Sequence, residues 1–90
     1  MVRPMEITFY GALWCSDCRR SKKVFEEEGV SYHYIGLDEE PEAAEIVTKL
    51  NDGYQIIPTI VFPNGKKLVE PEDTVLREAL KEYKKTLHDS

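Results

Sequence analysis

The sequence is poor in three kinds of residue pattern, and each shortage excludes a class of protein. Of its 90 residues only two are cysteines, which is too few for a scaffold of disulfides. No apolar run approaches the roughly 20 residues of a membrane-spanning helix. Acidic residues outnumber basic ones, and the formal net charge of -5 leaves no broad basic face for the phosphates of a nucleic acid. We therefore expect neither a membrane nor a nucleic acid as partner.

The first residues also lack the features of an export signal. Residues 1–11 contain one arginine followed by a strand-like alternation. Secretion instead requires an apolar segment of about 7 to 15 residues. We therefore expect the protein to reside in the cytoplasm.

What is present is the composition of a small folded protein. Hydrophobic residues make up 41% of the chain and charged residues 32%, which is enough for a core and a solvated surface. We find no repeat, linker or low-complexity segment, and we predict that residues 1–90 form a single domain that acts as a monomer.

Residue periodicity predicts strands and helices in the order βαβαββα. Alternating or β-branched stretches predict strands at residues 5–10, 32–35, 59–62 and 66–69. Apolar stripes and acidic or proline-containing starts predict helices at residues 16–28, from about 41 to 50, and from about 70 towards the C-terminus. Residues expected to face the core from the last two helices are Ala43, Ile46, Val47, Leu50, Val75, Leu76, Ala79, Leu80, Tyr83 and Leu87.

Three short signals define how these elements connect. Gly29 and Gly53 follow the first two helices, as expected of C-terminal caps. Asn64-Gly65 lies between two strand candidates and predicts an antiparallel hairpin. A helix between the first two strands predicts a parallel pair with a right-handed crossover. The fold class is therefore α/β, a four-stranded mixed sheet with three helices on its faces.

The two cysteines lie three positions apart at a predicted strand-to-helix junction. Cys15 is placed at the N-terminus of the first helix, where the helix dipole favours the thiolate form. Cys18 is placed one turn later, close enough to displace a mixed disulfide formed on Cys15. We expect Cys15 at the exposed helix end and Cys18 on the side of Val24 and Phe25, which faces the core. In a cytosolic chain this spacing is typical of a redox pair, so we predict that Cys15 attacks and Cys18 resolves.

A metal site is the main alternative reading of the same motif. Zinc needs about four ligands, and beyond the two cysteines only His33 and His88 remain. His33 lies within a predicted strand and His88 at the chain end, so neither is well placed to complete a site. A carrier in which Cys15 of two chains shares an iron–sulfur or zinc centre stays open, and visible absorption would reveal the iron–sulfur form.

Three stretches resemble a known family across nearly the whole chain. They are Trp14-Cys15-x-x-Cys18-Arg19-Arg20, Gln55-Ile56-Ile57-Pro58-Thr59 and Asn64-Gly65-Lys66. The sequence resembles the glutaredoxin-like group of the thioredoxin fold, especially mycoredoxins and the glutaredoxin-like electron donors of ribonucleotide reductase. The resemblance implies a disulfide reductase, and such a reaction requires no metal or organic cofactor because it is sulfur exchange. It also implies two kinds of transient partner, namely disulfide-containing proteins and an electron donor, which is a low-molecular-weight thiol or a reductase.

The resemblance also assigns roles to residues outside the cysteine motif. It implies that Pro58 is cis and faces Cys15, and that the backbone of Ile57 pairs with a bound substrate strand. Gln55 and Asp73 match positions that help hold glutathione in the family. We further expect these positions to form one substrate-binding surface.

Three departures from the family pattern concern glutathione. Glutathione-using members usually have a lysine, a tyrosine and a glycine pair where this chain has Ala12, Asp17 and Val69-Glu70. One cation is thus lost and two carboxylates are gained, which weakens capture of an anionic tripeptide.

Three charged residues beside the cysteines are expected to modulate the site, and one aromatic residue, Trp14, is expected to bind substrate. Asp17 disfavours the thiolate of Cys15, whereas Arg19 and Arg20 favour it. The first helix is basic early and acidic late, the reverse of what its dipole prefers, so the charge order serves the thiolate or is accidental. Trp14 either presents its face to a partner chain or packs half-buried beside the loop.

Overall fold

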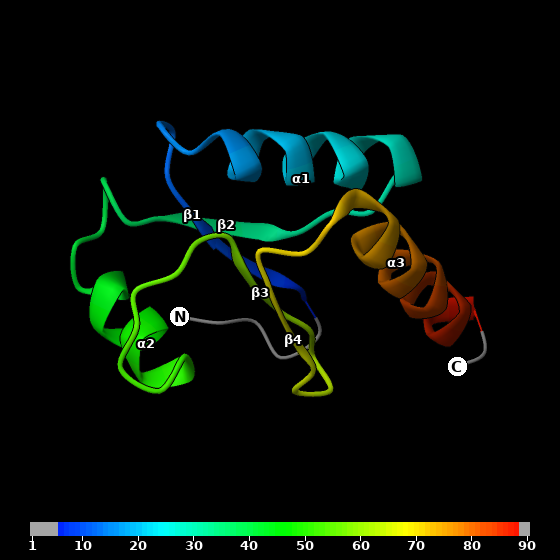
Figure 1. Ribbon diagram of the computed structural model, residues 1–90. Coiled ribbons are helices and arrows are strands. Elements are labelled where there is room, and N and C mark those ends of the chain that lie inside the picture. The colour runs from blue at the N-terminus through cyan, green and yellow to red at the C-terminus, as the bar shows by residue number, and fades with distance from the viewer. Residues whose placement is uncertain (1–5, 89–90) are drawn as a thin grey trace.

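A four-stranded mixed sheet is covered by helices on both faces in the computed structural model, which describes residues 6–88 (Figure 1). The elements are β1 (Thr8–Gly11), α1 (Ser16–Glu28), β2 (His33–Gly36), α2 (Ala43–Leu50), β3 (Thr59–Val61), β4 (Lys67–Val69) and α3 (Asp73–His88). The sheet order is β2-β1-β3-β4, with β1 parallel to β2 and antiparallel to β3, and β3 antiparallel to β4. The predicted order βαβαββα and the mixed sheet are confirmed.

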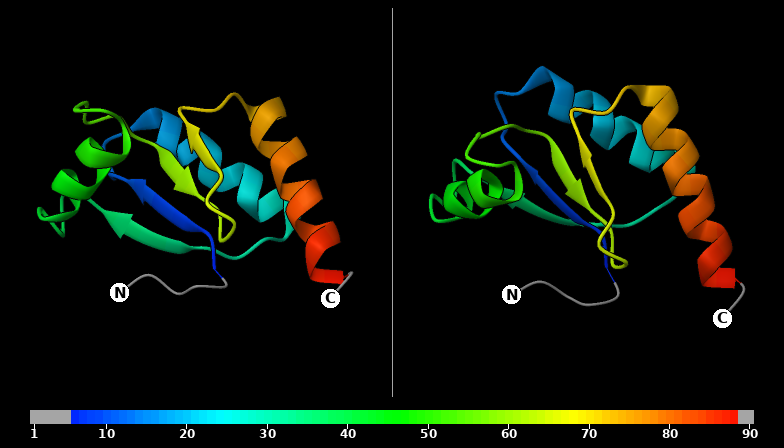
Figure 2. Two further views of the ribbon diagram at one scale, coloured as in Figure 1. Left: turned by 90° about the horizontal axis from the view of Figure 1, so that it is seen from below. Right: turned by 60° about the horizontal axis from the view of Figure 1, so that its bottom comes forward.

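The core has one layer on each face of the sheet. Helices α1 and α3 lie on one face and α2 lies on the other (Figure 2). The larger layer is formed by buried apolar residues that include Phe9, Phe25, Ile60, Leu76 and Leu80. Burying each such side chain contributes about 1.5 to 3 kcal/mol, so this layer supplies most of the apolar stabilisation.

Strand β1 is more deeply buried than its alternating sequence predicts. Phe9 packs in the layer under α1 and α3, whereas Tyr10 packs in the layer under α2. Thr8 and Tyr10, which alternate with Ile7 and Phe9, are only 1% and 3% exposed because β1 is an interior strand with helices on both sides. The predicted strand start at Met5 lies outside the described residues.

Two predicted helix starts were too early. Pro41 lies in a turn, and α2 begins at Ala43 after Glu42, which caps the helix without a side-chain hydrogen bond. Helix α3 begins at Asp73, and Glu70 is excluded from it by its left-handed conformation (φ 45°).

Two residues expected in the core are exposed instead. Ile46 is 45% exposed because the short helix α2 faces the sheet mainly through Ala43 and Val47. Val75 is 49% exposed because β4 is the edge strand, and within residues 6–88 no further strand lies beyond it to cover the first turn of α3. The side chain of Leu87 lies outside what the structure describes.

The predicted turn signals hold, with one difference. Gly29 caps α1 in the left-handed region (φ 68°), and its N–H donates to the carbonyls of Phe25 and Glu26. Gly65 closes the β3–β4 hairpin by donating its N–H to the carbonyl of Phe62. Asn51, rather than Gly53, is the residue that caps α2.

Candidate active site

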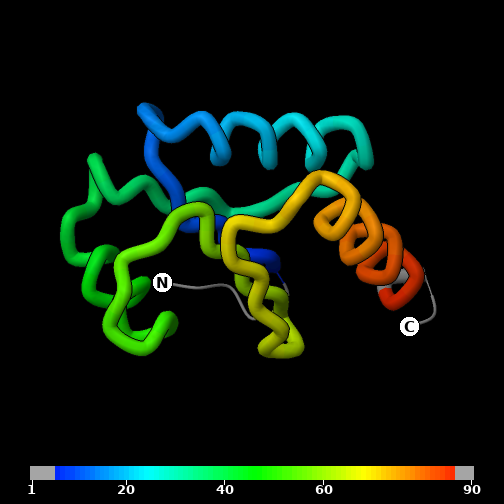
Figure 3. Tube along the Cα trace, in the orientation of Figure 1, coloured from blue at the N-terminus to red at the C-terminus, as the bar shows by residue number. Residues whose placement is uncertain are grey.

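The cysteine motif lies where β1 ends and α1 begins. The loop between α2 and β3 passes the same end of the sheet, which brings residues about forty positions apart together (Figures 2 and 3). This end is where the parallel strands β1 and β2 finish and the antiparallel strand β3 starts. The fold therefore places the side chain of Cys15, at the N-terminus of α1, against the loop that precedes β3.

Cys15 is the N-cap residue of α1 and is partly exposed. Its backbone is extended (φ -91°, ψ 114°), and its Sγ accepts a hydrogen bond from the backbone N–H of Cys18 at 3.2 Å. Its Sγ also lies 4.0 Å from the carbonyl oxygen of Ile57. A helix N-terminus and an N–H donor both stabilise negative charge, so this position suits a thiolate nucleophile.

Cys18 occupies the opposite environment. It is fully buried on the core side of α1, as predicted, and like Cys15 it is a free thiol. Burial, together with the hydrogen bond and proximity to Cys15, raises the pKa of Cys18 to about 12. A hydrogen bond from the backbone of Ala12 and the positive charge of Lys22 act in the other direction. Cys18 is therefore the protonated, shielded member of the pair.

The loop facing Cys15 has the cis peptide that the family resemblance implied. The Ile57–Pro58 bond is cis, and the carbonyl of Ile57 points at the cysteine as described above. The hydroxyl of Thr59 donates to the carbonyl of Ile56 at 2.6 Å and accepts from the side-chain amide of Asn51 at 3.0 Å. Two buried side chains thus fix the loop against the end of α2.

The end of β4 supports the same loop from its other side. The backbone N–H of Glu70 donates to the carbonyl of Pro58 at 2.9 Å. Glu70 stands where glutathione-using members have glycine, and it adopts the positive φ that glycine would accept without strain. Glutamate therefore occupies, at this position, a left-handed backbone conformation that favours glycine.

Trp14 projects into solvent beside the cysteines. It is 69% exposed, which contradicts the alternative of half-buried packing, and its neighbour Leu13 is 60% exposed. Gln55 is also exposed, at the start of the loop that leads to Pro58. Exposed apolar and amide groups beside a nucleophile are suited to contact an incoming chain.

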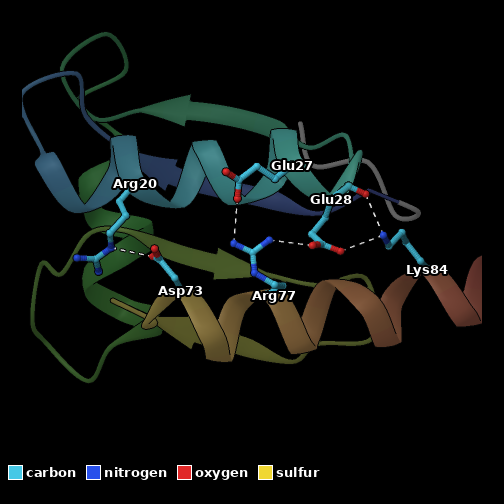
Figure 4. Close-up of polar contacts among 6 residues, drawn as sticks. All are labelled: Arg20, Glu27, Glu28, Asp73, Arg77 and Lys84. Atoms are coloured by element: carbon cyan, nitrogen blue, oxygen red, sulfur yellow. Dashed lines mark hydrogen bonds and ion pairs between the residues drawn. The ribbon is translucent and has the colours of Figure 1, made fainter.

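The two arginines after the motif both have partners. Arg20 lies between two carboxylates, with Asp73 Oδ1 2.9 Å from Nε and Asp17 Oδ1 3.3 Å from Nη1 (Figure 4 shows the Asp73 pair). Arg19 donates from Nη1 to the carbonyl of Leu13 at 3.1 Å, across the loop that holds Cys15. Asp73, expected to bind substrate, is thus engaged by a residue of the chain itself.

The charge order of α1 has a tertiary explanation that the sequence did not reveal. Arg77 of α3 donates to Glu27 and Glu28 at 2.9 Å each, and Lys84 donates to Glu28 at 3.1 Å (Figure 4). The acidic end of α1 lies beside the basic side of α3. Pairing between helices therefore explains the position of Glu27 and Glu28 at the end of α1, and it leaves both interpretations open for the basic residues at the start of the helix.

Sequence reasoning missed two residues next to the buried thiol. The Nζ atom of Lys22 lies 3.7 Å from the ring centroid of Tyr34, which comes from β2. Lys22 is one helical turn after Cys18, a spacing that the sequence does display. The position of Tyr34 carried no comparable signal, because the pairing of β2 with β1 decides it.

The described residues also bear on a metal site and on a membrane span. Among residues 6–88, no three His, Cys, Asp or Glu side chains are grouped in a way that could hold a metal ion. Within the same described range, no helix combines the length and apolarity needed to cross a bilayer. His33 lies in β2, as predicted, and the side chain of His88 lies outside the described part of the chain.

Comparison with known proteins agrees with this geometry. The family model for glutaredoxin matches residues 7–68. Mycoredoxin 1 of Corynebacterium glutamicum is 35% identical over 65 residues, which cover 72% of this chain and 80% of that protein.

Solved structures share the same fold. NrdH-redoxin from Escherichia coli has a TM-score of 0.68 at 24% identity, over 82% of this chain and 93% of that one. The buckwheat glutaredoxin–glutathione complex has a TM-score of 0.65 at 25% identity, over 87% of this chain and 71% of that one. The architecture is the thioredoxin-like fold of glutaredoxins.

A cysteine pair at a strand-to-helix junction, facing a cis-proline loop within this fold, defines a thiol–disulfide oxidoreductase. The chain belongs to the glutaredoxin family, and the predicted likeness to mycoredoxins is confirmed.

Proposed function

We propose that this chain reduces disulfides in proteins and mixed disulfides of small thiols, with Cys15 as attacking thiolate and Cys18 as resolving thiol. The observation that carries the proposal is the contrast between the two sulfurs. Cys15 is partly exposed and accepts an N–H bond at a helix N-terminus, whereas Cys18 is fully buried.

The reaction follows from this contrast in two steps. The thiolate of Cys15 attacks a substrate disulfide, forms a mixed disulfide and releases one substrate thiolate. Cys18 then attacks the Sγ of Cys15, which forms the Cys15–Cys18 disulfide and releases the second thiol. An external dithiol or pair of thiols must return the two electrons that the substrate gained.

Docking of the substrate involves the loop and the exposed surface beside the cysteines. The carbonyl of Ile57 lies beside Cys15 and can accept a hydrogen bond from the backbone of an extended substrate. Pro58 holds that carbonyl at the site, while Trp14 offers an exposed aromatic face. Gln55 adds an exposed amide to the same surface.

The electron donor is a low-molecular-weight thiol or a reductase, and the ion pairs disfavour glutathione. A structural relative binds glutathione, but here Arg20 already engages the carboxylate of Asp73. Weak capture of glutathione would leave mycothiol or a thioredoxin-type reductase as the donor. We propose further that residues 1–90 act as one domain, as a monomer carrying electrons between cytoplasmic partners.

Single-cysteine variants test the division of labour. Cys18→Ser should accumulate a mixed disulfide on Cys15 when mixed with a disulfide peptide, whereas Cys15→Ser should trap none. Mass spectrometry of the intact protein measures both. A stable adduct on Cys18 alone would contradict the proposal, and bound iron with a visible absorption band would favour the metal-carrier alternative.

Regeneration of the oxidised pair identifies the donor. The oxidised protein is offered glutathione, mycothiol or a thioredoxin reductase system, and recovery of two free thiols is followed over time. We expect recovery with glutathione to be the slower of the two small-thiol reactions. Faster recovery with glutathione than with mycothiol would overturn this assignment.

A further inference from the structure

The buried thiol of Cys18 faces an energetic obstacle in the second step. To attack the mixed disulfide it must lose its proton, yet burial is the main cause that raises its pKa to about 12. Once Cys15 is part of a mixed disulfide it carries no charge, and its contribution to that rise disappears. The cost of placing negative charge in an apolar environment remains.

A cation lies on the side of α1 that faces this thiol. Lys22 follows Cys18 by four residues and therefore projects from the same face of the helix. Its positive charge acts to favour ionisation of Cys18. Lys22 is also partly buried, whereas the adjacent Lys23 is exposed.

The ring of Tyr34 holds this cation in place. The Nζ atom of Lys22 sits 3.7 Å from the centre of the ring, within the range of a cation–π contact. Such a contact restrains a long side chain that would otherwise extend into solvent.

Two facing glycines make room for that ring beside Cys18. Gly11 of β1 and Gly36 of β2 are register partners, and a Cβ atom at either position would lie 3.2 to 3.3 Å from the ring of Tyr34. The same Cβ on Gly11 would lie 2.9 Å from the Sγ of Cys18. The ring and the buried sulfur therefore both border one small space above Gly11.

We propose that Lys22, positioned by the ring of Tyr34, stabilises the developing thiolate of Cys18 and so accelerates release of the reduced product. This inference rests on the proposed function, in which Cys18 is the resolving residue. In the step, Cys18 gives up its proton to water, the Cys18–Cys15 bond forms, the bond from Cys15 to the substrate sulfur breaks, and the departing thiolate takes up a proton from water according to its own pKa.

Other charged groups near Tyr34 define the pH dependence of the site. Burial raises the pKa of Tyr34 to about 12, with smaller contributions from Asp38 and Glu39 in the loop after β2 and from the two cysteines. Tyr34 therefore stays neutral while Cys18 reacts, and its ring rather than an ionised oxygen supports Lys22. The titratable groups around Cys18 are thus Cys15 and Lys22, and those around the ring of Tyr34 are the two carboxylates and the two cysteines.

Reaction with 5,5′-dithiobis(2-nitrobenzoate) separates the two chemical steps in one stopped-flow trace. The first yellow thiolate is released when Cys15 attacks, at a rate proportional to reagent concentration. The second is released when Cys18 resolves the adduct, at a rate independent of reagent concentration. The first phase and the second phase therefore report on different cysteines.

Lys22→Gln should slow the second phase about three- to tenfold near neutral pH and shift its pH profile to higher pH, while changing the first phase less than twofold. Lys22→Arg should restore the second phase, because it keeps the charge. Lys23→Gln removes the same charge from an exposed neighbour and should leave the second phase unchanged. Tyr34→Leu should act like a weaker Lys22→Gln, whereas Tyr34→Phe keeps the ring and should behave like the unmodified protein.

The experiment distinguishes an error about Lys22 from an error about Cys18. A second phase that Lys22→Gln leaves unchanged, or that Lys23→Gln slows equally, would overturn the role of Lys22. A protein with no second phase at all, even with Lys22 intact, would instead refute Cys18 as the resolving residue. Circular dichroism of each variant shows whether a slower phase accompanies loss of folded structure.

Discussion

Asp73 Oδ1 lies 2.9 Å from the Nε of Arg20, and this contact joins the start of α3 to α1 beside the cysteine motif. Asp17 lies 3.3 Å from the same guanidinium, so one cation is shared by two carboxylates. The side chains are about half exposed, which places the contribution of each pair to folding at about 0 to 1 kcal/mol. The effect of this arrangement is therefore expected on charge near Cys15 more than on stability.

Removing the positive charge of Arg20 and removing the negative charge of Asp17 should change the reactivity of Cys15 in opposite directions. Arg20→Gln leaves two carboxylates unbalanced and should slow alkylation of Cys15 by iodoacetamide roughly two- to threefold at low ionic strength. Asp17→Asn removes a carboxylate and should speed it, and the double variant should fall between. Rates measured in low and high salt provide the check, since the differences should fade with screening. Equal rates in all variants at low salt would show that these charges do not act on Cys15.

The buried hydrogen bonds of Thr59, which support the cis-proline loop, are expected to stabilise the folded protein. Thr59→Val leaves the amide of Asn51 and the carbonyl of Ile56 without their partner and should lower the free energy of unfolding by about 1 to 3 kcal/mol. Urea unfolding measures the change. Thr86→Val is the matched control, because Thr86 hydrogen bonds on an exposed face of α3 and its loss should cost about 0.5 kcal/mol or less. Equal losses in the two variants would show that the loop contact is not special.

The contact between α1 and α3 predicts a pH dependence of stability. Hydrogen bonds from Arg77 and Lys84 lower the pKa of Glu28 below its ordinary value of about 4.3. A lowered folded pKa means that the stabilisation is fully present above the unfolded pKa and is lost as the pH falls through the folded pKa. Glu28→Gln should therefore destabilise the protein at pH 7 and do so much less at pH 3.

Thermal unfolding at the two pH values measures that difference. Glu26→Gln is the matched control, since Glu26 is exposed on the same helix and should change stability less. A loss from Glu28→Gln that is equal at both pH values would point to packing rather than to charge.

The close approach of β1 to α1 predicts that Gly11 tolerates no side chain. A Cβ atom there would lie 2.9 Å from both the Sγ of Cys18 and the Cε1 of Phe9, two fully buried groups with little room to move. Gly11→Ala should cost about 1 to 3 kcal/mol through overpacking. Chemical denaturation measures this cost, and a stability equal to that of the unmodified protein would show that the core yields at this point.

Much of this protein could be predicted from short stretches of sequence. The period of apolar residues gave the seven elements in the right order, and Gly29 and Asn64-Gly65 marked a helix end and a hairpin correctly. The spacing of Cys15 and Cys18 at a strand-to-helix junction predicted one partly exposed and one buried sulfur. These features depend on residues within one or two turns of each other, so local geometry determines them.

Contacts between distant segments required the folded structure. Both faces of β1 are buried, although its residues alternate, because helices cover both faces of the sheet at this interior strand. Tyr34 meets Lys22 because β2 pairs with β1 beneath α1, and Arg20 meets Asp73 because α3 packs beside α1. No pattern within a single element contains such partners, since they are set by how the elements pack.

The charge order of α1 separates the two kinds of information most clearly. The sequence by itself determined that basic residues precede Glu27 and Glu28, against the preference of an isolated helix dipole. Only the tertiary structure decided why this order is acceptable. The acidic end lies against Arg77 and Lys84 of α3, and direct pairing at 2.9 to 3.1 Å offsets the unfavourable dipole effect, which water and salt also screen at the helix surface.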